Sequence, residues 1–176
     1  ALPICAVDSA ASEANALTVT SGTGNVTFTG AVGGGTNGTL GAVAVNSTGV
    51  TRFNATVSAA SVTTNAGGST ELNGNVTTSG AQAYGDAVVV DSGITLATTN
   101  SVVTFSGAVD SAASEANTLT VTSGTGNVTF TGAVGGGTNG TLGALAVNST
   151  GVTRFNATVS AAGVTTNAGG STELNG

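Results

Sequence analysis

The sequence of 176 residues has no histidine, lysine, methionine or tryptophan, and it has one cysteine and one proline. Histidine and lysine supply many of the general bases and nucleophiles of enzymes, so their absence argues against catalysis. One cysteine without any histidine cannot complete a zinc site. We therefore expect a protein that is not an enzyme and that uses no cofactor.

Charge is also scarce, because only 6% of the residues are charged and the net charge is −6. Arg52 and Arg154 are the only cations, which are too few to bind the phosphates of a nucleic acid. Apolar runs such as 87–90 are far shorter than the ~20 residues of a membrane-spanning helix. The composition predicts neither nucleic-acid binding nor membrane insertion.

The acidic residues are scattered along the chain rather than clustered. They are Asp8, Glu13, Glu71, Asp86, Asp91, Asp110, Glu115 and Glu173. Asp86 and Asp91 come closest to a cluster, and we favour a solvated or structural role for them over calcium binding or catalysis. The glycine- and aspartate-rich nonapeptide of calcium-binding β-rolls is absent. We therefore predict no metal site.

The abundant residues are threonine, valine, glycine, serine and asparagine, which favour strands and turns over helices. The stretch 25–32 returns unchanged at 127–134, and its apolar residues alternate with threonine. This period of two is typical of a strand with one buried face. Related stretches occur at 51–57, 70–76 and 103–109.

A long repeat organises the chain, because residues 7–74 return as residues 109–176 with three differences. The differing pairs are Ala16/Thr118, Val43/Leu145 and Ser61/Gly163. We predict one continuous segment, 1–176, with a first repeat of 102 residues at 7–108 and a truncated second repeat at 109–176. Such near-identity indicates a recent duplication, and we expect a piece of a longer tandem array.

A shorter period lies inside the repeat. Large apolar residues recur at steps of 25, 19, 12, 21 and 25, with a mean near 20. A strand, a tight turn, a second strand and a variable loop at this period are typical of a β-solenoid, in which each coil buries its apolar face on the next. We predict an all-β solenoid of about 20 residues per coil. Its single inward ladder would consist of Phe28, Phe53, Leu72, Tyr84, Phe105, Phe130 and Phe155.

Two features leave alternatives open. Gln82 and Asp86 flank Tyr84 at positions that should face inward, so we expect an irregular corner or a shifted register there. A length of 102 residues also suits one immunoglobulin-like sandwich, and the chain would then be a pair of them. The sub-period near 20 and the lack of tryptophan and of paired cysteines favour the solenoid.

Three motifs carry a resemblance to a known family. They are Gly-Asn-Val-Thr-Phe-Thr-Gly at 24–30, Asn-Ala-Gly-Gly-Ser-Thr-Glu-Leu-Asn-Gly at 65–74 and Ala-Gln-Ala-Tyr-Gly-Asp-Ala-Val at 81–88. Over essentially the whole chain they resemble the repeats of large bacterial surface proteins, the filamentous-haemagglutinin-like adhesins and related β-strand-repeat proteins. The resemblance implies secretion, a right-handed parallel β-helix as the shaft, and a role in adhesion or surface structure.

Cys5 is the only cysteine of the chain. It aligns with Gly107 when residues 5–8 are placed on 107–110. This alignment puts Cys5 in an inward column, so we predict a buried small residue rather than an intermolecular disulfide.

The two arginines each precede a phenylalanine anchor and should face outward. A pairing with the glutamate of the next rung, Glu71 for Arg52 and Glu173 for Arg154, is favoured over a ligand contact.

Nine Asn-X-Ser/Thr sequons occur, as expected in a chain this rich in asparagine and threonine. Asn37 and Asn139 lie in glycine-rich loops and are the best candidates for glycosylation. Outward threonine pairs such as Thr18 and Thr20 are an alternative functional feature, since a flat array of hydroxyl groups binds ice. The variable loops argue against a regular array.

These observations predict a structural segment of a secreted, extracellular cell-surface fibre or adhesin stalk. The alternatives are a solenoid module that binds carbohydrate or ice, and tandem immunoglobulin-like surface repeats. We expect end-to-end self-association or continuation into further repeats, because a coil with an unpaired edge offers strands for pairing. A host or matrix surface is a second expected partner.

Overall fold

The computed structural model describes residues 3–137 and 139–176. All regular elements within these residues are β-strands, which confirms the predicted all-β class. The eighteen strands are β1 (Leu17–Gly22), β2 (Val26–Phe28), β3 (Leu40–Ser47), β4 (Val50–Phe53), β5 (Val57–Thr64), β6 (Ser69–Leu72), β7 (Val76–Thr78), β8 (Gln82–Tyr84), β9 (Ala87–Val90), β10 (Ile94–Thr98), β11 (Val103–Phe105), β12 (Val109–Ser111), β13 (Leu119–Gly124), β14 (Val128–Phe130), β15 (Leu142–Ser149), β16 (Val152–Phe155), β17 (Ala161–Thr166) and β18 (Ser171–Leu174).

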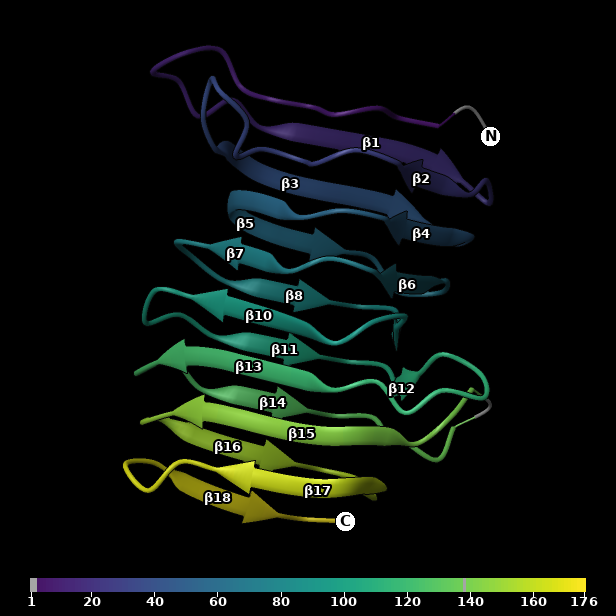
Figure 1. Cartoon of the computed structure of the whole chain (residues 1–176), viewed down its shortest axis with the longest axis vertical. Coiled ribbons are helices and arrows are strands. Elements are labelled where there is room, and N and C mark those ends of the chain that lie inside the picture. The colour runs from purple at the N-terminus through teal and green to yellow at the C-terminus, as the bar shows by residue number, and fades with distance from the viewer. Residues whose placement is uncertain (1–2, 138) are drawn as a thin grey trace.

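Every pair of these strands is parallel. Immunoglobulin-like sandwiches consist of antiparallel sheets, so the sandwich alternative is wrong. The strands follow one another down the long axis of the molecule, from β1 near one end to β18 at the other (Figure 1).

The strand pairings divide the chain into three columns, which we call faces. Face 1 is the sheet β2-β4-β6-β9-β12, continued by the bridges Val109–Val134–Val159. Face 2 consists of the first half of β5 with β7, β10, β13, β15 and β17. Face 3 consists of β1, β3, the second half of β5, β8, β11, β14, β16 and β18. The chain visits faces 3, 1 and 2 in turn, and we call one such passage a coil.

Partners in neighbouring coils lie between 18 and 26 residues apart, as for Leu72–Val90 and Val19–Val45. The variation lies in the connections, because loops such as 33–39 and 112–118 lengthen some coils. Face 3 has eight rungs, at Val19, Val45, Thr64, Tyr84, Phe105, Phe130, Phe155 and Leu174.

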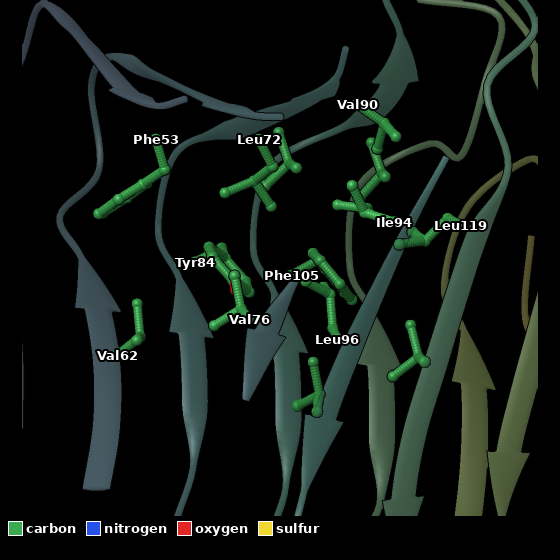
Figure 2. Close-up of a cluster of buried hydrophobic side chains, with 14 of the residues drawn as sticks. Phe53, Val62, Leu72, Val76, Tyr84, Val90, Ile94, Leu96, Phe105 and Leu119 are labelled. Carbon is green, nitrogen blue, oxygen red and sulfur yellow. The ribbon is translucent and has the colours of Figure 1, made fainter. Parts of the chain in front are cut away.

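The alternating residues of each strand fill a continuous apolar interior, as β2 and β11 show with their buried ends and half-buried centres. Figure 2 shows valine, leucine and aromatic side chains from successive strands meeting there. Each fully buried side chain of this kind contributes about 1.5–3 kcal/mol. Stacking is thus stabilised by apolar burial as well as by the backbone ladders.

The seven predicted anchors are all buried, but they form two ladders instead of one. Phe28 stacks on Phe53 with a centroid distance of 4.9 Å on face 1, and that ladder continues through Leu72 to Val90. The second ladder lies on face 3 and consists of Tyr84, Phe105, Phe130 and Phe155, with centroid distances of 5.3, 4.8 and 5.0 Å. The step of 12 residues from Leu72 to Tyr84 therefore leads to another face.

The 102-residue repeat does not contain a whole number of coils. From Phe28 the chain makes four passages to Ser111 on face 1, and then visits Val121 on face 2 and Phe130 on face 3. The repeat is thus four and two-thirds coils long. Equivalent residues of the two copies consequently lie on different faces.

Glycine is required where the chain turns from face 3 to face 1. A Cβ at Gly107 would stand 2.6 Å from the amide nitrogen of Ala87, and one at Gly132 would stand 2.5 Å from the carbonyl carbon of Gly107. The backbones of neighbouring coils approach too closely at this corner for a larger residue.

Candidate functional surfaces

A polar group lies inside the otherwise apolar stack. Gln82 is fully buried and donates from its Nε2 to the carbonyl oxygen of Ala97 at 2.9 Å and to Thr78 Oγ1 at 3.2 Å. The hydroxyl of Tyr84 donates to Gln82 Oε1 at 3.0 Å, and burial raises the pKa of Tyr84 far above its ordinary value. Every polar atom of Gln82 thus has a partner.

Of the two outcomes predicted around Tyr84, an irregular corner or a shifted register, the shifted register is wrong. β8 pairs in regular register with β5 and β11, and Gln82 faces inward as the alternation requires. The buried hydrogen bonds of Gln82 allow a polar residue at an apolar position without a shift.

Asp86 is the most buried carboxylate of the described chain, with 1% of its surface exposed. Its Oδ1 accepts from the amide of Gly68 at 2.8 Å, and its Oδ2 accepts from Thr70 Oγ1 at 3.2 Å. Burial raises the pKa of Asp86 more than these two hydrogen bonds lower it. The geometry makes Asp86 a structural link between the coils of β6 and β9.

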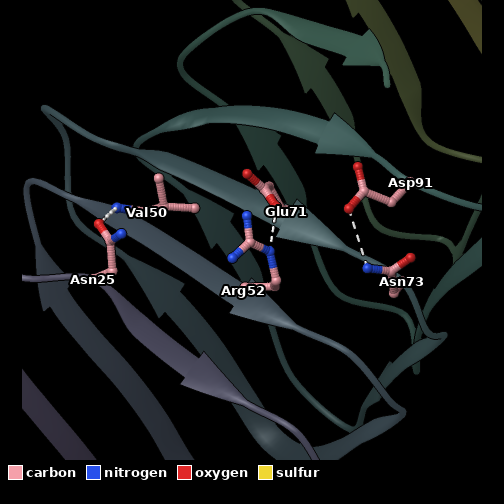
Figure 3. A network of polar contacts seen from close by, with 6 residues as sticks. All are labelled: Asn25, Val50, Arg52, Glu71, Asn73 and Asp91. Atoms are coloured by element: carbon pink, nitrogen blue, oxygen red, sulfur yellow. Dashed lines mark hydrogen bonds and ion pairs between the residues drawn. The ribbon is translucent and has the colours of Figure 1, made fainter. Parts of the chain in front are cut away.

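The predicted pairing of the arginines is confirmed, since Arg52 binds Glu71 and Arg154 binds Glu173 with an Nε–Oε2 distance of 2.7 Å in the second pair. Figure 3 shows the first pair beside Asp91, which accepts from Asn73 Nδ2 at 3.1 Å. Burial and the nearby charge of Glu71 raise the pKa of Asp91. Both ion pairs connect neighbouring coils.

The described residues contain no group of three or more acidic, cysteine or histidine side chains that could hold a metal ion. Asp86 and Asp91, the pair closest to a cluster in the sequence, bind protein donors on the preceding coil.

The predicted glycosylation candidates Asn37 and Asn139 are exposed in loops. By contrast, asparagines at the turns bind the next coil through their side chains, as Asn25 Oδ1 does in accepting from the amide of Val50 at 2.9 Å (Figure 3). Asn127 and Asn75 do the same toward Val152 and Thr95. These turn asparagines are part of the stacking.

The prediction that Cys5 is buried is wrong, because Cys5 is exposed and has no disulfide partner within residues 3–137 and 139–176. Ile4 pairs with Phe28 and Val7 with Val32, so two residues separate the inward positions where the next coil has three. Cys5 therefore lies on the outside of a corner that is one residue shorter.

The outward threonines do not form the regular double row that an ice-binding face requires. Thr18 on face 3 is followed along its column by Ala44, Thr63, Ala83, Thr104, Thr129, Arg154 and Glu173. Thr20 is followed by Asn46. Alanine thus interrupts the threonines of this column twice, and the column ends in an arginine and a glutamate.

The C-terminal end of the stack has a hollow of about 330 Å³, which we call the end groove. It is lined by Phe155, Val159, Ala161, Val164, Thr166, Thr172 and Leu174. Val164 is 46% exposed and Leu174 is 73% exposed, so apolar surface faces outward here. An unpaired coil edge was predicted from the sequence, but its shape follows only from the packing of β17 and β18.

Comparisons of the chain with models of known protein families, with curated proteins and with solved structures gave no match. In the part of the chain that the structure describes, no helix is long and apolar enough to cross a membrane.

Proposed function

We propose that the chain is a right-handed parallel β-helix that serves as a rigid, non-catalytic spacer in a secreted cell-surface fibre or adhesin stalk. The observation that carries the proposal is the unbroken parallel pairing of eight rungs on face 3, from Val19 to Leu174. Right-handedness follows the strong preference of parallel crossover connections.

Rigidity follows from the way in which the coils are joined. Backbone ladders, stacked aromatic rings and the inter-coil bonds of Arg52, Asp86 and Asn25 all run along the same axis. Each coil contacts only its neighbours, so the length of such a stack grows with the number of coils and a force applied at one end passes through every coil to the other. The sparse charge and the absence of histidine and lysine agree with a spacer rather than an enzyme.

The partners that we propose are further repeat units at the ends of the stack, with a host or matrix surface as a second partner. An extracellular location goes with this role. Negative-stain electron microscopy of cells that display arrays with increasing numbers of 102-residue repeats tests the proposal. Surface fibres that lengthen in proportion to the repeat number would support a spacer, and a constant fibre length would contradict it.

A further inference from the structure

The end groove has a counterpart inside the same molecule. Residues 155–176 repeat residues 53–74 with a single difference, Gly163 in place of Ser61. The residues that line the groove correspond to Phe53, Val57, Ala59, Val62, Thr64, Thr70 and Leu72, and each of these is at most 3% exposed. The chain therefore shows one surface twice, once covered and once open.

The segment 75–91 covers the buried counterpart. β7 places Val76 and Thr78 opposite Val57 and Ala59. β8 places Gln82 and Tyr84 opposite Val62 and Thr64, and β9 places Val88 and Val90 opposite Thr70 and Leu72. One continuous segment of three strands thus supplies an inward partner for six of the seven residues that correspond to the lining of the end groove, all except Phe53, which pairs with Leu72.

Hydrogen bonds also join the segment 75–91 to the covered surface. The amides of Val57 and Asp91 donate to the carbonyl oxygens of Asn75 and Leu72 at 2.9 and 3.0 Å, respectively. Thr70 Oγ1 donates to Asp86, whereas the equivalent Thr172 Oγ1 donates to Thr166 Oγ1 at 3.1 Å. In the first copy the threonine hydroxyl donates to the carboxylate of Asp86 on the next coil. In the second copy that carboxylate is missing, and the hydroxyl of Thr172 donates to the nearby Thr166 instead.

We propose that the end groove binds an extended segment with the sequence of residues 75–91, in parallel register. The inference rests on the proposed stacking of repeats and names the segment that stacks. With the faces of the two copies aligned, the N-terminal coil of a second copy would present Val7, a residue of face 2, opposite Thr166, whose equivalent Thr64 lies opposite Tyr84. The segment 75–91 offers larger side chains for this hollow of about 330 Å³, since Tyr84 and Gln82 are joined there by a hydrogen bond of 3.0 Å.

A synthetic peptide with the sequence 73–92, titrated into the isotope-labelled full chain, tests this proposal by NMR. We expect saturable binding of one peptide per chain, with the largest shifts at Val164, Thr166 and Leu174. A peptide with aspartate in place of Tyr84 and Val88 is the control and should not bind. Absence of binding, or equal binding of both peptides, would overturn the proposal.

A matched pair of protein variants separates binding from folding. Leu174→Asp should leave the melting temperature nearly unchanged, because Leu174 is exposed, and should abolish peptide binding. Leu72→Asp, at the equivalent buried position, should unfold the protein. Unchanged peptide binding by Leu174→Asp would show that the peptide does not occupy the groove.

A chain extended after Gly176 by the sequence 75–108 gives an independent measurement. The amide protons of Val164 and Thr166 should become at least tenfold better protected from exchange than in the original chain. No gain in protection would contradict the proposal. Association of the original chain into filaments without peptide binding would mean that a second copy fills the groove, which would leave the stacking of repeats intact but overturn the segment proposed here.

Discussion

Phe28 and Phe130 have the same sequence neighbours, yet Phe28 lies in the ladder of face 1 and Phe130 in the ladder of face 3. Phe28 stacks on Phe53, and Phe130 stacks between Phe105 and Phe155. The same residues thus support stacking on either face. This interchange is possible because the alternating pattern specifies which side chains face inward and leaves the choice of face to the number of preceding coils.

The aromatic ladder of face 3 should carry much of the stability. Phe130→Asp removes a fully buried ring and buries a charge, so it should cost more than the about 3–5 kcal/mol of a Phe truncation. Thr129→Asp faces outward beside Arg154 and should change stability by less than about 0.5 kcal/mol. Urea unfolding of both variants makes the comparison, and equal losses would show that the register is wrong.

The corner glycines should tolerate no side chain. Gly107→Ala places a Cβ against the backbone of the preceding coil and should cost about 1–3 kcal/mol. Gly163→Ala is the control, since a Cβ there meets no atom within 4 Å. Thermal unfolding of the two variants measures the difference, and similar melting temperatures would contradict the close approach of the coils.

Stability should increase as the pH falls from 7 toward 4. Burial raises the native pKa of Asp86 and of Asp91, so the native state takes up these protons at a higher pH than the unfolded chain. The gain begins at the raised native pKa values and is complete below the unfolded value of about 3.9. Urea midpoints across this range test the sign, and a steady loss of stability on acidification would refute it.

Asp86→Asn is the matched variant for the pH series. An amide keeps an acceptor for Gly68 and carries no charge, so the pH dependence of unfolding should become shallower. An unchanged slope would assign the pH dependence to groups other than Asp86.

Chelation of metal ions should have no effect on folding. The acidic side chains with raised pKa values, Asp86 and Asp91, already bind donors of the protein, and no metal-binding cluster occurs in the described residues. Circular dichroism and the melting temperature should be the same with and without EDTA. A large drop in melting temperature on chelation would reveal a calcium site, for which Asp86 and Asp91 are the first residues to replace.

Contacts between coils can be predicted from the sequence where adjacent residues share the same separation along the chain. Arg52 and Glu71 are separated by 19 residues, as Phe53 and Leu72 are, and both pairs are adjacent in the structure. Prediction fails where the number of residues between two anchors has to show whether the second anchor lies one coil further on the same face or on another face. Leu72 and Tyr84 are such a pair. Spacing contains no information about direction around the axis, so the two ladders emerge only from the strand pairing.

The burial of the polar residue Gln82 could not be predicted either, nor could the short corner between Ile4 and Val7. Gln82 fits inside because Ala97 and Thr78, from other strands, accept its hydrogen bonds, and these partners are invisible to periodicity. Cys5 lies outside because the corner between Ile4 and Val7 has one residue fewer than the corner that contains Gly107. A single deletion moves a residue from the inside to the outside.

The central claim is that the repeat is a stack of coils four and two-thirds deep, and the length added per repeat tests it most directly. Small-angle X-ray scattering from purified chains with one, two and three additional 102-residue repeats gives that increment. At about 4.8 Å per coil, each repeat should lengthen the particle by about 22 Å. An increment near 34 Å, the diameter of a compact domain of 100 residues, would show that each repeat folds as a separate globule and would contradict the account.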